Sequence, residues 1–325
     1  MRNPRTLLLL YLLCSLSTYA QTIDSLQTNG QVLAFLKKLQ HEWDYKTGLS
    51  KRVRQDENLK SRYKQFGTRT MEKADFDDNG HTDLLFNGYA DMREWDHNAS
   101  LVVLAFGNDS FQVKDLVDHR ADFFAARLIT ISGQPFIKTA SIQKGFFNQP
   151  DTPSTRERTD TLQYMAGEFI ERSIPENYNI EQVKFCFLGG PGSSFSPFNI
   201  NMQGDSATFQ RERIEGFYPT ADSGGLYKTR LESTTRDKIM RLLQYMHFPI
   251  LKDQYAGELY GHHTTGILHI TYNGGKTKKI VSIDVAGPYA LKALQQIFWE
   301  FGRTQHWILV DASAPFSFCP DILWK

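Results

Sequence analysis

Alternating and helical patterns of hydrophobic residues divide this chain into segments of different character. Near the N-terminus, apolar residues recur at i, i+3, i+4, i+7 and i+11, at Val32, Phe35, Leu36, Leu39 and Trp43. This spacing predicts an amphipathic helix with one buried face. The following segment, residues 46–65, is charged and has no regular period, which predicts a loop or a short helix.

Between residues 69 and 172 the hydrophobic period changes to two, which is the period of a half-buried strand. The apolar runs are separated by turn sequences at Gly107-Asn108-Asp109, Ser132-Gly133 and Ala166-Gly167. Turns of this kind join neighbouring antiparallel strands. We therefore expect a β-rich domain of antiparallel hairpins over residues 69–175.

Residues 178–310 combine both periods. A strand is predicted at residues 182–188, and hairpins are predicted around Gln203-Gly204-Asp205 and Asn273-Gly274. One helix is expected after candidate N-caps at Ser233 to Thr235, and another with Pro288 in its first turn. Their apolar stripes are Ile239, Leu242, Leu243 and Met246 in the first helix and Leu291, Leu294, Phe298 and Phe301 in the second.

Together these elements predict the α+β fold class. A helical lead-in at residues 21–68 precedes the β-rich domain of antiparallel hairpins, and an α+β C-terminal domain at 178–310 precedes a tail at 311–325. The length of 325 residues also suits two domains.

The first 20 residues have the features of a secretory signal peptide. Arg2 and Arg5 precede the apolar run Leu7 to Leu13, and Thr18-Tyr19-Ala20 places small residues before Gln21. No later stretch approaches the roughly 18 apolar residues that a membrane span requires. We therefore expect an exported protein without a membrane span, located in the periplasm or outside the cell.

Composition and charge narrow the function classes. The chain has 37 basic and 36 acidic residues, so its net charge of +1 gives no support for a nucleic-acid partner. Two cysteines follow the signal segment, Cys186 and Cys319. An oxidising compartment permits a disulfide between them, but the sequence does not establish whether they pair.

An acidic loop at residues 74–88, "ADFDDNGHTDLLFNG", carries the clearest candidate chemistry. Calcium prefers six to eight hard oxygen ligands, and a glycine allows such a loop to turn sharply. The spacing predicts a calcium site with side-chain ligands and one backbone carbonyl, at Asp75, Asp77, Asn79, Asp83 and His81 (carbonyl). The alternative is an Asx-rich turn that binds no metal. Phe86 stands where an EF-hand has its bidentate Glu, and a strand follows instead of a helix.

The loop resembles the calcium loop of FG-GAP and VCBS repeats over about 15 residues, in a single copy. This resemblance implies the same five ligands, and we expect the ion to have a structural role at the entry to the sheet.

A second resemblance covers residues 182–302. The features that carry it are Cys186, Pro197, the Asp253-Gln254-Tyr255 turn, the strand start at Thr264-Thr265 and the Gly274-Gly275-Lys276 hairpin. They resemble the family called domain of unknown function 6438. Members often carry a second cysteine before the proline, where this chain has Ser196, and the family has no established activity.

Other chemical readings are less well supported. Adjacent His262 and His263 lack metal-binding helix spacing, and "GGPGSS" at residues 189–194 fits no nucleophile or phosphate-loop motif. A glycan partner would need exposed aromatic residues, and the candidates are Trp95, Tyr218, Tyr260, Trp299, Trp307 and Trp324.

The sequence thus favours an exported, non-catalytic binding or interaction module with one structural calcium loop and an unknown protein or glycan partner. The alternative is an envelope hydrolase with Asp253, Glu258 and His263 in a cleft.

Overall fold

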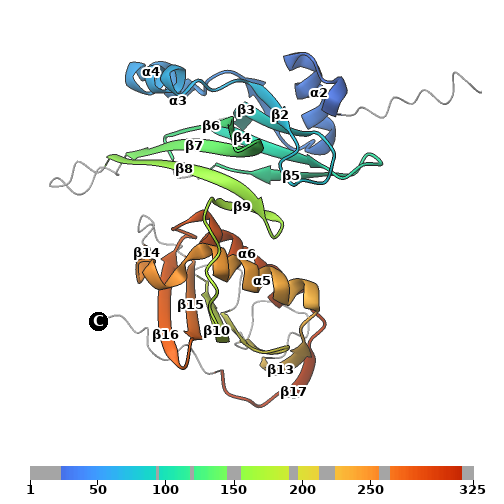
Figure 1. Cartoon of the computed structure of the whole chain (residues 1–325), viewed down its shortest axis with the longest axis vertical. Coiled ribbons are helices and arrows are strands. Elements are labelled where there is room, and N and C mark those ends of the chain that lie inside the picture. The colour runs from blue at the N-terminus through green and yellow to red at the C-terminus, as the bar shows by residue number, and fades with distance from the viewer. Residues whose placement is uncertain are drawn as a thin grey trace, which may run out of the picture. The chain divides into compact units, whose positions relative to one another are not determined.

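The chain forms two compact units, Met1–Gln163 and Tyr164–Lys325, in the computed structural model (Figure 1). The division lies before the expected boundary at residues 175–178. Antiparallel sheets dominate, so the fold is strand-rich and compatible with a mixed α+β class. The structure describes residues 23–92, 95–117, 121–144, 155–189, 197–211, 224–255 and 264–316.

The first unit contains short helices and two antiparallel sheets. Its helices are the 3-10 helix η1 (Ile23–Ser25), α2 (Asn29–Leu39), α3 (Lys51–Gln55) and α4 (Glu57–Phe66). Its strands are β1 (Asp44–Thr47), β2 (Met71–Ala74), β3 (Asp83–Met92), β4 (Trp95–Ala105), β5 (Phe111–Asp115), β6 (Phe123–Ile131), β7 (Gln134–Lys144) and β8 (Thr155–Met165), which crosses the division. One sheet has the order β1-β3-β4-β5 with β2 also on β3, and β6-β7-β8 belong to another.

The helix predicted near the N-terminus is confirmed as α2, but it ends at Leu39, so Trp43 of the predicted apolar stripe lies outside it. Thr28 caps it through a capping box with Gln31, which satisfies backbone N–H groups of the first turn. Val32 and Leu36 are fully buried and pack in one cluster with Leu84 and Phe86 of β3 and with residues of β4. This helix therefore covers the sheet from which the acidic loop emerges.

The segment 46–65 contains more structure than its charged sequence indicates. It holds the end of β1 and the two helices α3 and α4, so the expected layout of a helix followed by hairpins is only partly confirmed. Ser50 and Asp56 cap the two helices. Each helix buries one fully enclosed apolar side chain, Val53 or Leu59, against Phe123 of β6.

The second unit contains one large sheet and two long helices. Its helices are α5 (Ser233–Met246), the 3-10 helix η2 (Phe248–Ile250) and α6 (Tyr289–Thr304). Its strands are β9 (Glu168–Glu171), β10 (Ile180–Leu188), β11 (Phe198–Gln203), β12 (Ser206–Arg211), β13 (Gly225–Arg230), β14 (Gln254–Tyr255), β15 (Thr265–Tyr272), β16 (Lys276–Ile283) and β17 (Ile308–Asp311). The order of the large sheet is β14-β16-β15-β10-β11-β12-β13-β17, and β9 is not part of it but is the neighbour of β8.

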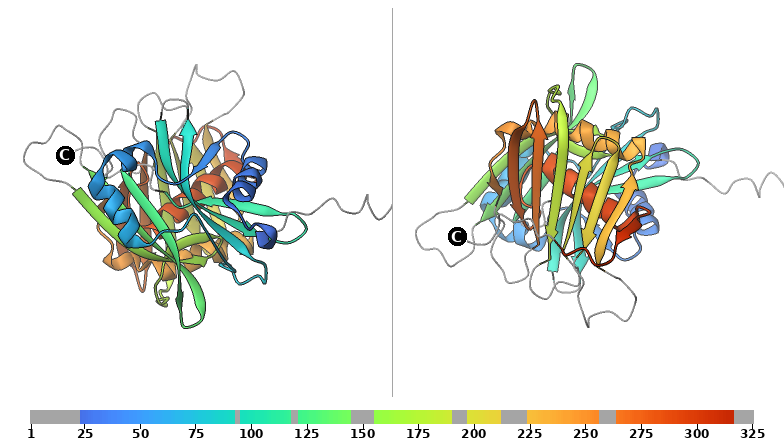
Figure 2. Two further views of the ribbon diagram at one scale, coloured as in Figure 1. Left: turned by 90° about the horizontal axis from the view of Figure 1, so that it is seen from above. Right: turned by 90° about the horizontal axis from the view of Figure 1, so that it is seen from below.

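Both long helices cover one face of this sheet, and Figure 2 shows α6 behind the strands in its right-hand view. All eight apolar positions predicted for the two helices are buried in this core. Phe298 of α6 stacks on Phe185 of β10 with ring centroids 5.0 Å apart. The hairpins predicted at Gln203-Gly204-Asp205 and Asn273-Gly274 are confirmed as β11–β12 and β15–β16.

Several local predictions for the second unit were wrong. Helix α5 has Glu232 as its N-cap, without a side-chain cap bond, so Ser233 is already helical. Pro288 is the N-cap of α6 and precedes the first turn. Gln254–Tyr255 form strand β14 parallel to β16, where the sequence indicated a turn.

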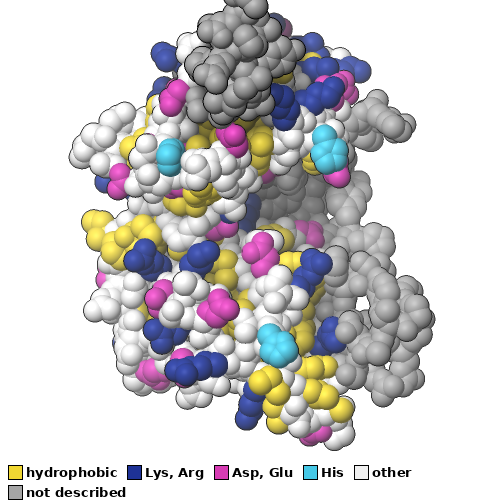
Figure 3. Space-filling view, turned by 90° about the vertical axis from the view of Figure 1, so that its right-hand side faces the viewer, with side chains coloured by type: hydrophobic (Ala, Val, Ile, Leu, Met, Phe, Trp, Pro, Cys, Tyr) yellow, Lys and Arg dark blue, Asp and Glu magenta, His cyan; other side chains and the backbone are white. Residues whose placement is uncertain are grey.

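Cys186 lies on β10, is buried, and is disulfide-bonded. The other cysteines, Cys14 and Cys319, lie outside the described residues. Within the part of the chain that the structure describes, no helix is long and apolar enough to cross a membrane. On the described part of the face in Figure 3, acidic and basic side chains lie close together.

Candidate metal centre

The acidic loop connects β2 to β3, which pair as an antiparallel hairpin with Ala74 opposite Asp83. The pairing places Asp75 and Asp83 at the base of the loop, on either side of its mouth. Gly80 has a φ of 84° and Asp78 a φ of 58°, both in the left-handed region that a tight turn needs. The glycine and Asx residues of this segment thus produce the turn that the sequence indicates.

Backbone N–H groups fix two of the carboxylates. Asp75 accepts hydrogen bonds from the N–H groups of Asn79 (3.0 Å) and Gly80 (2.8 Å). Asp83 is fully buried and accepts from the N–H groups of Phe76 (2.7 Å) and Ala105 (2.8 Å). Since each carboxylate oxygen has two lone pairs, these four bonds leave acceptor capacity on both groups.

The structure brings three of the five predicted ligands together. One carboxylate oxygen from each of Asp75, Asp77 and Asp83 lies within 4.8 Å of the others, and this acidic triad could hold a metal ion. Asp77 accepts a 3.0 Å hydrogen bond from Asn79 Nδ2 on its Oδ2 atom. Its other oxygen, Oδ1, is buried and has no hydrogen-bond partner among the described residues.

The carboxylates of the triad perturb one another. Burial raises the pKa of Asp83 to about 6, against the lowering effect of its two backbone hydrogen bonds and with smaller contributions from the charges of Asp77 and Asp75. Burial, followed by the charge of Asp75, also raises the pKa of Asp77. A cation at this position would relieve both the desolvation and the repulsion.

Of the remaining two predicted ligands, Asn79 takes part in other hydrogen bonds. Asn79 Oδ1 accepts from the backbone N–H of His81 (2.8 Å), which leaves one lone pair for an ion. Asn79 Nδ2 also donates to the carbonyl oxygen of Ala105 (2.8 Å). The imidazole of His81 lies beside Gly107, where an added Cβ would come within 3.1 Å of Nε2. The predicted ligand, however, is the carbonyl of His81.

Sequence reasoning missed the role of Ala105. Its N–H donates to Asp83 and its carbonyl oxygen accepts from Asn79, so the last residue of β4 connects the loop to the sheet through both backbone groups. No sequence signal marks this contact, because it depends on a backbone group 22 residues from Asp83.

The other candidate clusters do not converge in the described structure. Asp253 is 85% exposed and forms a 2.6 Å ion pair with Lys278. Glu258, His262 and His263 lie outside the described residues, as does most of the "GGPGSS" segment.

Two of the aromatic residues considered for glycan stacking are partly buried and pack against the core of the second unit. Trp299 packs against Phe187 with ring centroids 4.6 Å apart, and Trp307 stacks on Phe209 at 5.0 Å. The side chains of Trp95, Tyr218, Tyr260 and Trp324 lie outside the described set.

Comparisons with protein-family models, with curated proteins and with solved structures gave no match. The interpretation of the acidic loop therefore depends on its own geometry. All candidate donors are oxygen atoms, which suits a hard divalent cation and excludes a site selective for soft metals. The buried Oδ1 atom of Asp77 is an acceptor without a hydrogen-bond partner that a cation would satisfy, so the residues fit such an ion.

Proposed function

We propose that this chain is an exported, non-catalytic binding protein whose first unit is stabilised by one calcium ion in the loop between β2 and β3. The observation that carries the calcium proposal is the acidic triad with the partnerless, buried Oδ1 atom of Asp77. Asp75, Asp77 and Asp83 would be ligands, and Asn79 Oδ1 and the carbonyl of His81 complete the proposed set.

Calcium is preferred over magnesium because the donors come from a single irregular loop. Mg²⁺ requires near-ideal octahedral geometry and loses its water reluctantly, whereas Ca²⁺ accepts irregular sets of six to eight oxygens. The loop supplies two fixed carboxylates and a third with a free oxygen, and water can complete the coordination. We therefore expect calcium to bind and magnesium to be a weak substitute.

The proposed role of the ion is structural. The loop joins β2 to β3, and Ala105 at the end of β4 contacts both Asn79 and Asp83. An ion held by this loop would therefore fix three strands relative to one another. It would also neutralise carboxylates whose pKa values burial has raised, so folding and binding would be coupled.

A binding role is favoured over the envelope hydrolase by the surroundings of Asp253. A general acid or base would need a cleft and a perturbed environment. Instead, the carboxylate of Asp253 is exposed and paired with Lys278. Export is proposed from the N-terminal segment alone. The resemblance to domain of unknown function 6438 would imply a fold for the second unit and no activity.

Thermal unfolding of the mature chain with calcium, with magnesium and with a chelator tests the calcium proposal. Sites in extracellular modules bind calcium with Kd values of about 0.1–1 mM. At about 10 mM calcium this corresponds to roughly 1.4–2.7 kcal/mol of stabilisation, or a rise of roughly 3–10 °C in Tm for a unit of this size.

Two variants in the same loop give a matched comparison. Asp77→Asn removes the charge of the carboxylate with the partnerless oxygen and should abolish the calcium-dependent rise in Tm. Asp78→Asn removes one charge from an exposed neighbour outside the triad, and asparagine tolerates its positive φ, so the rise should persist. An unchanged Tm for the unmodified chain in calcium, or an equal loss in both variants, would overturn the proposal.

A further inference from the structure

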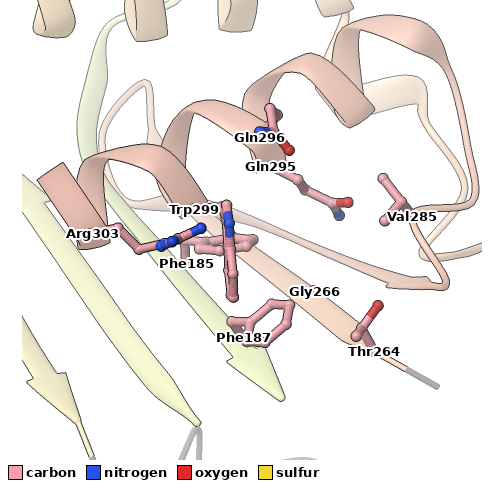
Figure 4. Close-up of a pocket in the computed structure, with 9 residues that line it drawn as sticks. All are labelled: Phe185, Phe187, Thr264, Gly266, Val285, Gln295, Gln296, Trp299 and Arg303. Carbon is pink, nitrogen blue, oxygen red and sulfur yellow. The ribbon is translucent and has the colours of Figure 1, made fainter. Parts of the chain in front are cut away.

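A cleft in the second unit lies between α6 and the neighbouring strands β10 and β15 (Figure 4). It has a volume of about 300 Å³, at the lower end of the range for small-molecule sites. Phe185 and Phe187 of β10 and Trp299 of α6 supply its apolar walls. Phe185 is almost completely buried, whereas Trp299 is only partly buried, so the cleft leads from the core to the surface.

A polar group without a partner points into this apolar cleft. Gln295 of α6 is only 7% exposed, and its Nε2 atom has no hydrogen-bond partner among the described residues. Figure 4 shows its amide directed into the space between Val285 and Gly266. A Cβ at Gly266 would lie 2.8 Å from Nε2, so the amide keeps its observed position because this residue has no side chain. A buried donor of this kind calls for an acceptor atom from a ligand.

Among the described residues that line the cleft, Arg303 is the one charged side chain, and none is a carboxylate. The guanidinium carbon of Arg303 lies 5.6 Å from the ring centroid of Trp299. Its side chain is exposed, so it stands at the outer end of the cleft. This arrangement is complementary to a ligand with an anionic group next to an apolar or aromatic body.

The polar and apolar groups follow one another along a single helix face. Gln295, Trp299 and Arg303 are spaced by four residues, so their side chains lie in a row on α6. The rise of an α-helix separates the first from the last by about 12 Å along the axis. A ligand that contacts all three must be elongated, with an oxygen at each end and a ring in the middle.

The mouth of the cleft also contains a strained turn. Val285 has a φ of 55° and follows Asp284, which has a φ of 54°. A left-handed backbone is unfavourable for a β-branched residue, and such strain is concentrated at ligand sites. Val285 is nevertheless 45% exposed and lines the cleft, where its side chain would be covered by a bound molecule.

We propose that this cleft binds an aryl carboxylic acid. The ring packs against Trp299 and Phe187, the carboxylate faces Arg303, and an oxygen at the opposite end accepts a hydrogen bond from Gln295 Nε2. The inference rests on the proposed binding role and deepens it by naming a ligand class. The cleft and the metal centre belong to different units, so each can fail without the other.

Isothermal titration of the mature chain with 4-hydroxycinnamate tests the inference, because this acid has a carboxylate and a phenolic oxygen at opposite ends of one ring system. We expect saturable binding at one site. The primary amide of the same acid should bind at least about tenfold more weakly, as expected for the loss of one charge-assisted hydrogen bond.

Three variants assign the contacts. Gln295→Leu removes the buried donor and Arg303→Met removes the exposed charge, and each should weaken binding of the acid about tenfold or more. Arg241→Met removes an exposed arginine of α5 that does not line the cleft and should leave binding unchanged. Because Arg303 is exposed, its variant should fold even if the buried substitution does not.

Absence of binding at several millimolar acid, equal affinity for the acid and its amide, or wild-type affinity in Arg303→Met would each overturn the inference. The calcium-dependent rise in Tm, measured on the same sample, distinguishes this failure from that of the metal proposal. If the calcium-dependent rise in Tm is present and the acid does not bind, only the aryl-carboxylate site is overturned.

Discussion

Replacing Glu171 by alanine should destabilise the second unit, because this side chain lies on strand β9 and caps the N-terminus of helix α6. Pro288, the N-cap of α6, makes no side-chain cap bond. The carboxylate of Glu171 on β9 instead accepts hydrogen bonds from the N–H groups of Tyr289 (2.5 Å) and Ala290 (3.0 Å). These donors belong to the first turn, whose N–H groups have no partner within the helix.

The magnitude follows from two effects. Loss of an N-terminal cap costs about 0.5–2 kcal/mol, and loss of a negative charge at the positive end of the helix dipole costs about 0.3–1 kcal/mol more. Because Glu171 is partly buried and bonds two donors, we expect the upper part of this range, about 2–3 kcal/mol. Since α6 also carries Gln295, Trp299 and Arg303, ligand affinity at the cleft should fall in parallel.

Urea unfolding followed by tryptophan fluorescence measures this effect, and a loss of this size corresponds to a midpoint lower by roughly 1 M. Glu232 provides a matched control, because it occupies the N-cap of α5 without making a cap bond. Glu232→Ala should therefore cost less than about 1 kcal/mol, the most that an exposed charge near a helix end contributes. Equal losses in the two variants, or a loss below about 0.5 kcal/mol in Glu171→Ala, would show that the hydrogen bonds of Glu171 do not stabilise the N-terminus of α6.

Three further predictions concern the first unit. Burial raises the pKa of Tyr63 to about 12, so the contribution of this side chain to the free energy of unfolding is present below pH 10 and is lost as the pH rises towards 12. Phenylalanine does not titrate, so Tyr63→Phe should gain about 1.4 kcal/mol relative to the unmodified chain between pH 8 and pH 11, as measured by urea unfolding at both pH values. Asp77→Asn should be at least as stable as the unmodified chain in chelator, because its carboxyl pKa is raised and the charged form is disfavoured; a lower Tm in chelator would contradict this. Ser100 donates a 2.8 Å hydrogen bond to Asn87 Oδ1 in the buried interior, so Ser100→Ala should lower the free energy of unfolding by about 1–3 kcal/mol in the same urea assay, and an unchanged midpoint would refute the reasoning.

The sequence predicted elements whose signals are local. The hairpin at Asn273-Gly274 depends on two turn residues between alternating strands, and both adopt positive φ values in β15–β16. The stripe of Ile239, Leu242 and Leu243 required only the helical period, and all three side chains are fully buried.

Elements that depend on distant partners were not predictable in the same way. β17 spans the predicted boundary between the C-terminal domain and the tail, with only Asp311 in the tail, and it exists because Ile308 and Leu309 pair with β13, about 80 residues earlier in the chain. Gln254–Tyr255 form a strand only through parallel pairing with β16. Such short strands have no period of their own, so tertiary pairing decides their structure.

The same distinction holds for the two candidate sites. The spacing of Asp75, Asp77 and Asp83 is a local feature and was sufficient to predict an acidic cluster, whereas the contact of Asp83 with Ala105 was not visible in the sequence. The cleft was missed altogether, because its walls come from strands and a helix far apart in the chain. Trp299 attracted attention only as one of several aromatic residues.

Direct titration of the metal-free mature chain with calcium tests the central claim most directly. The account predicts binding at a single site with a Kd of about 0.1–1 mM, retained in Asp78→Asn and lost in Asp77→Asn. The absence of binding heat in the unmodified chain at millimolar calcium, with the chain shown to be folded, would contradict the claim that this loop is a calcium site.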